Sequence, residues 1–309
     1  MTLDESYLAY PRRQRGQDIE RYDWSPMEGR AAAKLAGDVK LAVSIVVPIE
    51  YFPLTPSGKP FRHPGAMVTP YPDLRHYTTR DYGNRVGAFR LLKAFAEAGV
   101  KATFAVNAIL LDRSRPLIDA ILADGHEIAA HGLSTDHIHH GGLTEAEERA
   151  YTDKTRAAFE AAGLRPRTWM SPARQESTRT PDLVRAAGFD ICLDWEFDVA
   201  PVGLRTSCGP LVAFPLLSEL DDRTLLTIKN HDESRWRDQI IEAAKYMRDE
   251  AATRGAECLS FTMTPYVAGQ PFRMWAVKEI LAALGAIDGA SVVPVATHVD
   301  NFSTGNPQQ

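Results

Sequence analysis

Two side chains that can exchange protons stand directly after apolar segments of this chain. Glu50 follows the β-branched run of residues 40–49, and His131 follows the short apolar segment 127–130. A carboxylate beside such a run is costly unless it is paired or protonated, and a carboxylate of raised pKa in a cleft is a candidate general base. His131 also fits a core histidine bonded to a backbone carbonyl, but Gly132 after it permits a sharp turn or a ligand. We therefore expect proton-transfer chemistry at Glu50 and His131.

Further polar residues follow other apolar segments. They are Asn107, Ser171 to Arg174, Trp195 to Asp198, Thr264 and His298. If the apolar segments are parallel strands of one barrel, their C-terminal ends meet at a single mouth. Taken singly, each of these residues is explained equally well as a loop residue in contact with water. Taken together, they favour one shared pocket.

The elements that would position these residues alternate between apolar strands and helices. The expected strands are residues 40–47, 102–106, 127–130, 168–170, 189–193, 211–214, 225–228, 258–263 and 291–295, and the expected helices are 86–98, 115–123, 144–162, 180–188, 234–253 and 271–284. Residues 51–80 contain six prolines and little periodicity, which predicts a long loop. Alternating strands and helices are typical of βαβ units around a parallel sheet. We expect an α/β fold with a single distorted (β/α) barrel of about seven strands over residues 39–300, an irregular N-terminal arm at 1–38 and a flexible tail at 301–309.

Composition excludes several classes of partner. The 309 residues are 44% hydrophobic and 24% charged with a formal net charge of −5, so there is no electrostatic footprint for nucleic acid or anionic lipid. The three cysteines lack a Cys-x-x-Cys spacing, which argues against a disulfide framework or a thiolate zinc site. No secretory signal or membrane-length apolar run is present, so we expect a cytoplasmic protein without a membrane partner. The polar and aromatic arm suggests a homo-oligomer, either a dimer or a tetramer.

The tract His137-Ile-His-His140 invites a metal-site interpretation. Histidines this close together on a glycine-flanked loop, just before a helix with a capping box at Thr144, are more often exposed. We therefore expect this tract to be a surface loop.

Five motifs in order resemble the polysaccharide deacetylase superfamily, and they are most similar to its cytoplasmic allantoinase-like and cyclic-imide hydrolase branch. They are DYGNRVG at residues 81–87, ATFAVN at 102–107, GHEIAAHG at 125–132, WMSPAR at 169–174 and PYVAGQPFR at 265–273. The resemblance implies a distorted β/α barrel, often oligomeric, that hydrolyses an amide-type C–N bond.

The sequence departs from that family at the metal site. The resemblance implies an Asp-His-His site, but the acid here is Glu50, Thr135 stands four residues after His131, and Thr264 replaces a late histidine. A catalytic zinc normally has three protein ligands, and Glu50 and His131 supply two unless His137, Asp136 or Asp198 completes the set. Our leading expectation is that no cofactor is required, with a single zinc-like divalent metal on Glu50 and His131 as the alternative.

The leading hypothesis is ring opening of a small cyclic amide, imide or ureide. Glu50 is the expected base or metal ligand, His131 the acid or ligand, and Asp198 orients His131 or reads a substrate N–H. Arg174 is a candidate clamp for a carboxylate or developing oxyanion. The other expected substrate-binding residues are Tyr82, Arg85, Asn107, Ser171, Trp195 and Thr264. Tyr82 and Trp195 are explained equally well as core aromatics, and Arg85 as the partner of an acid.

Two other functions remain open at this stage. One is a metal-dependent N-deacetylase of an acetylated sugar, against which the missing histidines count. The other is a non-catalytic binding protein that kept the barrel and lost the chemistry. Thr135 and Thr264 are what such a protein would show, whereas the retention of Glu50, His131 and Arg174 argues for an enzyme.

Overall fold

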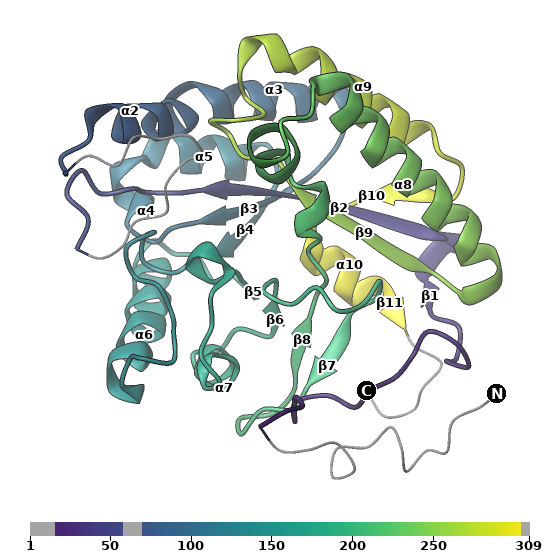
Figure 1. The fold of residues 1–309 in the computed structure, drawn as a ribbon, viewed down its shortest axis with the longest axis horizontal. Coiled ribbons are helices and arrows are strands. Elements are labelled where there is room, and N and C mark those ends of the chain that lie inside the picture. Colours follow the sequence, from purple (N-terminus) through teal and green to yellow (C-terminus); the bar gives the residue numbers. More distant parts are fainter. Residues whose placement is uncertain (1–15, 58–69, 304–309) are drawn as a thin grey trace.

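The computed structural model describes residues 16–57 and 70–303, and one curled nine-stranded sheet organises them (Figure 1). Its neighbours follow the order β10-β2-β3-β4-β5-β6-β8-β7, and β9 also pairs with β2. The strands are β2 (Leu41–Ile49), β3 (Thr103–Val106), β4 (Glu127–Ala130), β5 (Thr168–Trp169), β6 (Ile191–Cys192), β7 (Val202–Leu204), β8 (Leu211–Ala213), β9 (Glu257–Thr262) and β10 (Ala290–Val292). All neighbours are parallel except β7 and β8. The expected α/β barrel is confirmed.

Helices cover the outside of the curled sheet, except that the last one packs against the sheet's interior. They are α2 (Leu74–Tyr82), α3 (Ala88–Ala98), α4 (Leu110–Arg113), α5 (Arg115–Ala123), α6 (Glu145–Ala161), α7 (Thr180–Ala186), α8 (Glu233–Arg254), α9 (Met274–Ala286) and α10 (Val295–Asn301). Figure 1 shows α3, α8 and α9 beside β2 and β9, and α6 toward β4 and β5. The capping box expected at Thr144 forms at the start of α6.

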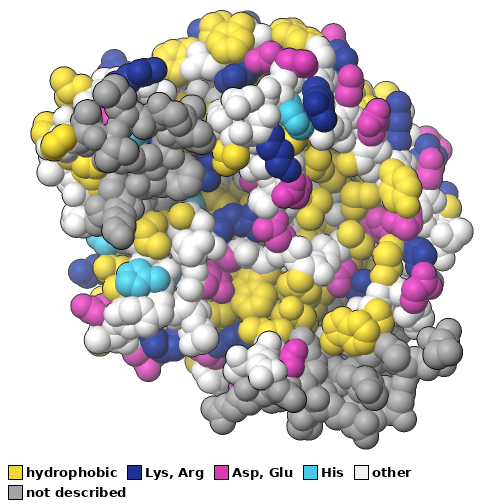
Figure 2. Space-filling view, viewed as in Figure 1, with side chains coloured by type: hydrophobic (Ala, Val, Ile, Leu, Met, Phe, Trp, Pro, Cys, Tyr) yellow, Lys and Arg dark blue, Asp and Glu magenta, His cyan; other side chains and the backbone are white. Residues whose placement is uncertain are grey.

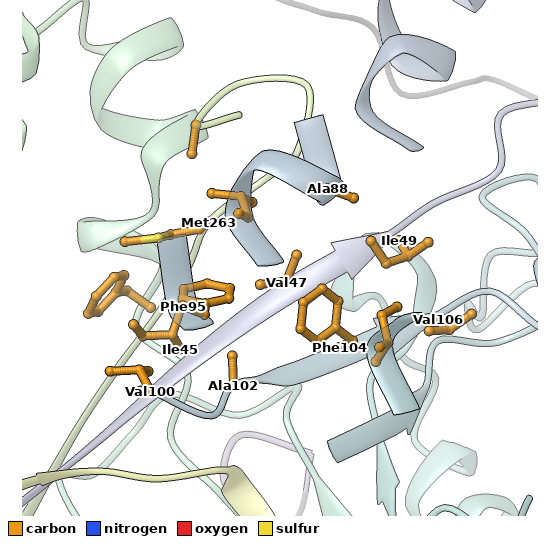
Figure 3. Packing of buried hydrophobic residues seen from close by; sticks show 14 of the residues in the cluster. Ile45, Val47, Ile49, Ala88, Phe95, Val100, Ala102, Phe104, Val106 and Met263 are labelled. Carbon is orange, nitrogen blue, oxygen red and sulfur yellow. The ribbon is translucent and has the colours of Figure 1, made fainter. Parts of the chain in front are cut away.

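Two buried layers show which way the strand side chains point. Ile49, Val106 and Ala130 belong to the core between sheet and helices, and Figure 3 shows Ile49 and Val47 on β2 near Phe95 and Ala88 of α3. A second cluster, with members from seven strands or their ends, fills the barrel interior and includes Val46, Ala105 and Ala129. Because side chains alternate along a strand, the residues after β2, β3 and β4 point inward at the mouth.

Three expected elements differ from the structure. Helix α2 (Leu74–Tyr82) begins inside the expected loop 51–80, and residues 58–69 of that loop lie outside the described residues. The expected strand 225–228 is part of a π-helical turn, η5 (Arg223–Ile228). The expected strand 291–295 ends at Val292, and α10 begins at Val295 after Pro294.

A small second sheet joins the two ends of the described chain. Within the expected arm, Lys34–Leu35 forms β1, which pairs antiparallel with β11 (Phe302–Ser303) from the expected tail. Residues 1–15 of the arm and 304–309 of the tail lie outside the described residues. Over the described ranges, no helix combines the length and apolar character needed to cross a bilayer.

Two glycines allow the segment before α3 to pack closely against the loop after β9. A Cβ at Gly87 would stand 2.0 Å from the carbonyl oxygen of Pro265, and one at Gly269 would stand 2.4 Å from the same atom. Gly87 ends the π-helical turn η2 (Gly83–Gly87), which links α2 to α3. The two segments therefore meet at a distance that only glycine allows.

Candidate active site

Glu50 and His131 meet inside the mouth of the barrel. His131 is 1% exposed, and its Nδ1 lies 2.9 Å from the carbonyl oxygen of Met170, to which it donates. This hydrogen bond leaves His131 Nε2 facing Glu50 Oε1 at 3.5 Å. Within the described part of the chain, His131 Nε2 and Glu50 Oε2 are buried without a hydrogen-bond partner. Both atoms are therefore placed to serve a bound molecule.

Positive charge around Glu50 keeps its carboxylate ionised. Burial alone raises the pKa of Glu50, but His131, Arg223 and Arg80 together lower it more, so the pKa is below its usual value. Of the two alternatives that the sequence left open for Glu50, pairing or protonation, the structure shows pairing. The apolar strand before Glu50 gave no sign of the two guanidinium groups near this residue, which come from other segments of the chain.

The sequence analysis missed Arg80, Arg223 and Tyr266. The Arg80 guanidinium carbon lies 4.6 Å from the centre of the Phe52 ring and 5.5 Å from that of Tyr266. Burial and the charge of Glu50 raise the pKa of the Tyr266 phenol. The positive charge of Arg223 acts to lower the pKa values of both Glu50 and Tyr266. The available signal for Tyr266 was its place in the late motif at 265–273.

Two π-helical turns deliver side chains to this region. Turn η2 carries Asn84, whose Nδ2 donates to the carbonyl oxygen of Glu50 at 2.8 Å, and Arg85. Turn η5 begins with Arg223. Such turns are rare in helical proteins and often occur at functional sites. Their positions agree with a site between β2 and these two turns.

A cavity of about 340 Å³ opens beside Glu50. Its walls come from the end of β2, from α2 and η2, and from α4. The lining residues are Glu50, Tyr51, Phe52, Tyr77, Arg80, Asp81, Asn84, Arg85, Leu110, Arg113 and Ser114. Figure 2 shows acidic and basic side chains close together in the middle of the displayed face. The cavity has the size of a small-molecule site.

Three expected binding residues use their polar atoms within the fold. Asn107 accepts from the Tyr51 N–H at 2.8 Å and donates its amide to the carbonyl of His131. Ser171 Oγ accepts from Trp169 Nε1 at 2.9 Å, and the Thr264 hydroxyl donates to Asp222 at 2.9 Å. These contacts fix the ends of β2, β4, β5 and β9. We assign Asn107, Ser171 and Thr264 to positioning the mouth.

Arg174 lies at the mouth next to a second group of charges. It follows β5 in the turn η3 (Pro172–Arg174), with φ of 51° after Ala173 at 56°. Its Nη2 is 3.8 Å from Glu196 Oε2. The positive charges of Arg174 and Arg223 both act to lower the pKa of Asp221, against the larger effect of burial. Nε and Nη2 are buried without a hydrogen-bond partner in the described structure. Two successive non-glycine residues in the left-handed region are strained, as is common at functional sites.

The other three expected binding residues differ in whether they line the cavity beside Glu50. Arg85 lines the cavity and pairs with Asp81 at 3.6 Å. Tyr82 accepts a hydrogen bond from Arg90 and does not line the cavity. Trp195 also lies outside the cavity lining and packs edge-on against Tyr22 of the arm, with ring centres 6.1 Å apart. The structure therefore brings Arg85 to the site and gives Tyr82 and Trp195 other contacts.

Asp198 is not part of this site. The neighbouring Val199 carbonyl accepts from the Cys258 N–H at 2.8 Å, and Cys258 pairs with Ala42 near the start of β2. At about 3.3 Å per residue, Ala42 lies roughly 25 Å from Glu50. Asp198 instead pairs with Arg30 at 2.6 Å. The expectation that Asp198 orients His131 was wrong.

His298 also lies at the far end of the barrel. Its helix α10 is tied to the start of β3, since the Val295 N–H donates to the Thr103 hydroxyl at 2.9 Å. His298 is fully buried against Phe214, and burial lowers its pKa to about 4. It is a neutral core histidine, and its expected place at the mouth was wrong.

The histidine tract mixes buried and partly exposed rings. His139 is fully buried and its Nδ1 lies 3.2 Å from Glu148, whereas His137 contacts the Ser134 hydroxyl at 2.8 Å. His140 Nδ1 accepts from the Gly142 N–H. The tract is therefore only partly the exposed loop that we expected, and its contacts are with nearby polar groups.

The residues at the mouth do not fit the metal site that the resemblance implies. Thr135 donates its hydroxyl to the Tyr51 carbonyl at 2.8 Å, and no third His, Cys, Asp or Glu among the described residues joins Glu50 and His131 as a ligand. Two guanidinium groups act on Glu50 and would repel a divalent cation. We therefore derive no step through a metal at this pair.

A different group has the ligand types for a metal. Atoms of Glu176, Cys192 and Asp194 all lie within 4.8 Å of one another. Burial, with Asp194 nearby, raises the pKa values of Glu176 and Cys192 well above their usual range. These two residues would have to release protons to bind an ion, which makes metal binding there strongly pH-dependent.

Comparison with known proteins finds a family similarity over part of this barrel. Residues 71–192 match the family model described as Polysaccharide deacetylase. This segment runs from the start of α2 to the end of β6 and includes Arg80, His131 and Arg174. Over this segment the chain is similar to polysaccharide deacetylases. A search of curated proteins gave no match.

Solved structures with the same fold carry several functional descriptions. One is a probable polysaccharide deacetylase from Pseudomonas aeruginosa PAO1, with 23% identity, a TM-score of 0.73, and coverage of 86% of this chain and 91% of that one. Another is Puue allantoinase, with 20% identity, a TM-score of 0.74 and the same coverage of 86% and 91%. A CE4 family pseudoenzyme from Bacillus anthracis has 13% identity and a TM-score of 0.51, over 85% of this chain and 66% of its own. At these identities the likeness shows the fold alone.

Proposed function

We propose that this protein hydrolyses a C–N bond in a small cyclic amide, imide or ureide. The observation that carries the proposal is the contact of Glu50 Oε1 with His131 Nε2 at 3.5 Å in the barrel mouth. A buried carboxylate and imidazole with unused polar atoms are suited to proton transfer. Glu50 also lines the cavity of about 340 Å³, which is suited to one small ring.

The pair supplies a base and a route for the proton. Glu50, held ionised by its surroundings, accepts a proton from water as the water oxygen attacks the carbonyl carbon. His131 Nδ1 donates to the Met170 carbonyl, which leaves Nε2, 3.5 Å from Glu50 Oε1, as the ring nitrogen that can relay this proton. Delivery of this proton to the ring nitrogen accompanies cleavage of the C–N bond. The products are a carboxylate and the released nitrogen, which is an amine from a cyclic amide, an amide from an imide and a urea nitrogen from a ureide.

The arginines near the pair can stabilise the oxyanion of the tetrahedral intermediate. The charge of Arg223 lowers the pKa values of both Glu50 and Asp221, and the charge of Arg174 lowers that of Asp221. A guanidinium fixed in a partly buried site stabilises charge that develops in the transition state. Arg223 is our first choice for this role and Arg174 the second, because Arg223 is the one that acts directly on Glu50.

Puue allantoinase and a probable polysaccharide deacetylase share this fold. The site residues favour a small cyclic substrate over an acetylated sugar. A deacetylase of the implied metal-dependent type needs a third metal ligand. The hydroxyls of Thr135 and Thr264, which stand where that type has histidines, instead donate hydrogen bonds to Tyr51 and Asp222. Our proposal therefore assigns the chemistry to Glu50 and His131 without a bound ion.

A substrate panel tests the proposal. Allantoin, hydantoins, succinimide-type imides and dihydropyrimidines are compared with acetylated chitooligomers, using the parent protein, Glu50→Gln and His131→Asn. We expect turnover of at least one ring, no acetate release, and loss of turnover in both variants. Acetate release from chitooligomers, or turnover unchanged in both variants, would contradict the proposal. Tight binding of one ligand without turnover of any would favour the non-catalytic alternative.

A further inference from the structure

The cavity beside Glu50 carries more positive than negative side chains. Its lining includes three arginines, Arg80, Arg85 and Arg113, against two acids, Glu50 and Asp81. Both acids are engaged, because Glu50 contacts His131 at 3.5 Å and Asp81 pairs with Arg85 at 3.6 Å. The excess positive charge therefore favours an anionic ligand.

Arg113 is the arginine placed to receive that anion. It ends α4 at the cavity edge, and its guanidinium carbon lies 4.8 Å from the centre of the Tyr51 ring. Within the described ranges no carboxylate lies within 4.0 Å of it, whereas Arg115, two residues on, pairs with Asp119 at 2.8 Å. A guanidinium whose face contacts an aromatic ring keeps the donors on its edge for a carboxylate.

The charged residues that line the cavity favour different ligand groups. Glu50 is held ionised, so a ligand carboxylate would be repelled beside it. A neutral amide or ureide group meets no such repulsion. Arg113 and the hydroxyl-bearing Ser114 line the same cavity and favour an anionic group. A ligand that suits both Glu50 and Arg113 has a neutral ring and an anionic substituent.

We infer that the substrate is a ring that carries a carboxylate, with the carboxylate bound by Arg113 and the scissile amide facing Glu50 and His131. This inference rests on the proposed function and narrows its substrate class. It predicts that an uncharged ring of the same size is a poor substrate, because Arg113 then has no anionic partner in the cavity. A charge-assisted bidentate contact at a partly exposed site changes affinity by about tenfold or more.

Matched ligand pairs test the inference without turnover. Binding of hydantoin and hydantoin-5-acetate, and of dihydrouracil and dihydroorotate, is measured by calorimetry on the His131→Asn variant. The same titrations are repeated after adding Arg113→Met, which keeps the aliphatic contact with Tyr51. Arg115→Met is the control, since it removes the same charge from an exposed pair outside the cavity lining.

We expect the carboxylated member of at least one pair to bind about tenfold more tightly, with the preference lost in Arg113→Met and kept in Arg115→Met. Equal affinities, a preference that survives Arg113→Met, or no binding of any carboxylated ring would overturn the inference. Turnover of the same rings by the parent is measured separately. Arg113-dependent binding without any turnover would refute the proposed hydrolysis and leave the assignment of the ligand class standing.

Discussion

Replacing Glu50 by glutamine removes one negative charge while keeping the shape of the side chain. In the parent, Glu50 Oε1 lies 3.5 Å from His131 Nε2. If the imidazole is charged, Coulomb attraction at that separation is at most about 5 kcal/mol for an effective dielectric constant of about 20. Glutamine relieves the desolvation of the carboxylate, so the net loss of stability should be about 2–3 kcal/mol.

This loss should appear as a fall in Tm of about 3–5 °C, because the unfolding entropy of a chain of this length makes each kcal/mol worth about 1.5 °C. Removal of the general base should also lower kcat on any ring hydrolysed by the parent by about 100-fold or more. Calorimetry and steady-state kinetics measure the two effects. Glu97→Gln is the matched control, because its partners Lys93 and Lys278 are exposed, and it should move Tm by less than about 1 °C.

Turnover by Glu50→Gln within about threefold of the parent would refute the role assigned to this residue. An unchanged Tm with reduced turnover would instead show that the charge contributes to catalysis and not to the fold. Loss of both in Glu97→Gln would show that the effects are not specific to the mouth.

Three further outcomes follow from the structure. Burial raises the pKa of Asp222 from 3.8 to about 7. The parent should therefore lose about 4 kcal/mol of stability relative to Asp222→Asn as pH rises from about 4 to 7. The same dependence of unfolding free energy on pH in both proteins would contradict this. Gly87→Ala should lower Tm by several degrees, because its Cβ would stand 2.0 Å from the Pro265 carbonyl, whereas Gly285→Ala in α9 meets nothing within 4 Å and should raise Tm slightly. Treatment with a chelator followed by gel filtration should leave kcat unchanged, and loss of activity that zinc restores would place a metal in the reaction.

The sequence predicted the elements whose buried faces are apolar. Strand β2 is a continuous β-branched run that is fully buried, and helix α6 carries a recognisable capping box. Helix α2 was missed because its buried residues are His76 and Arg80, so it has no apolar periodicity to detect. The run Leu225–Ile228 was read as a strand because a short apolar segment does not distinguish a strand from a buried helical turn.

The dependence on apolar periodicity also decided which site residues could be predicted. Glu50 and His131 were recognised because each follows an apolar strand and points inward in a barrel. Arg80 and Arg223 were missed because they come from helical turns that sequence periodicity did not reveal. The error at Asp198 arose from the loop after β6, which runs to the opposite end of β9. Strand order alone cannot show such a path.

The most direct test of the proposed chemistry is a crystal structure of Glu50→Gln with a ring from the substrate panel. We expect the scissile carbonyl within about 4 Å of residue 50 and of His131 Nε2, with the ring carboxylate on Arg113. A ring bound away from His131, or a metal ion between His131 and the ligand, would contradict it.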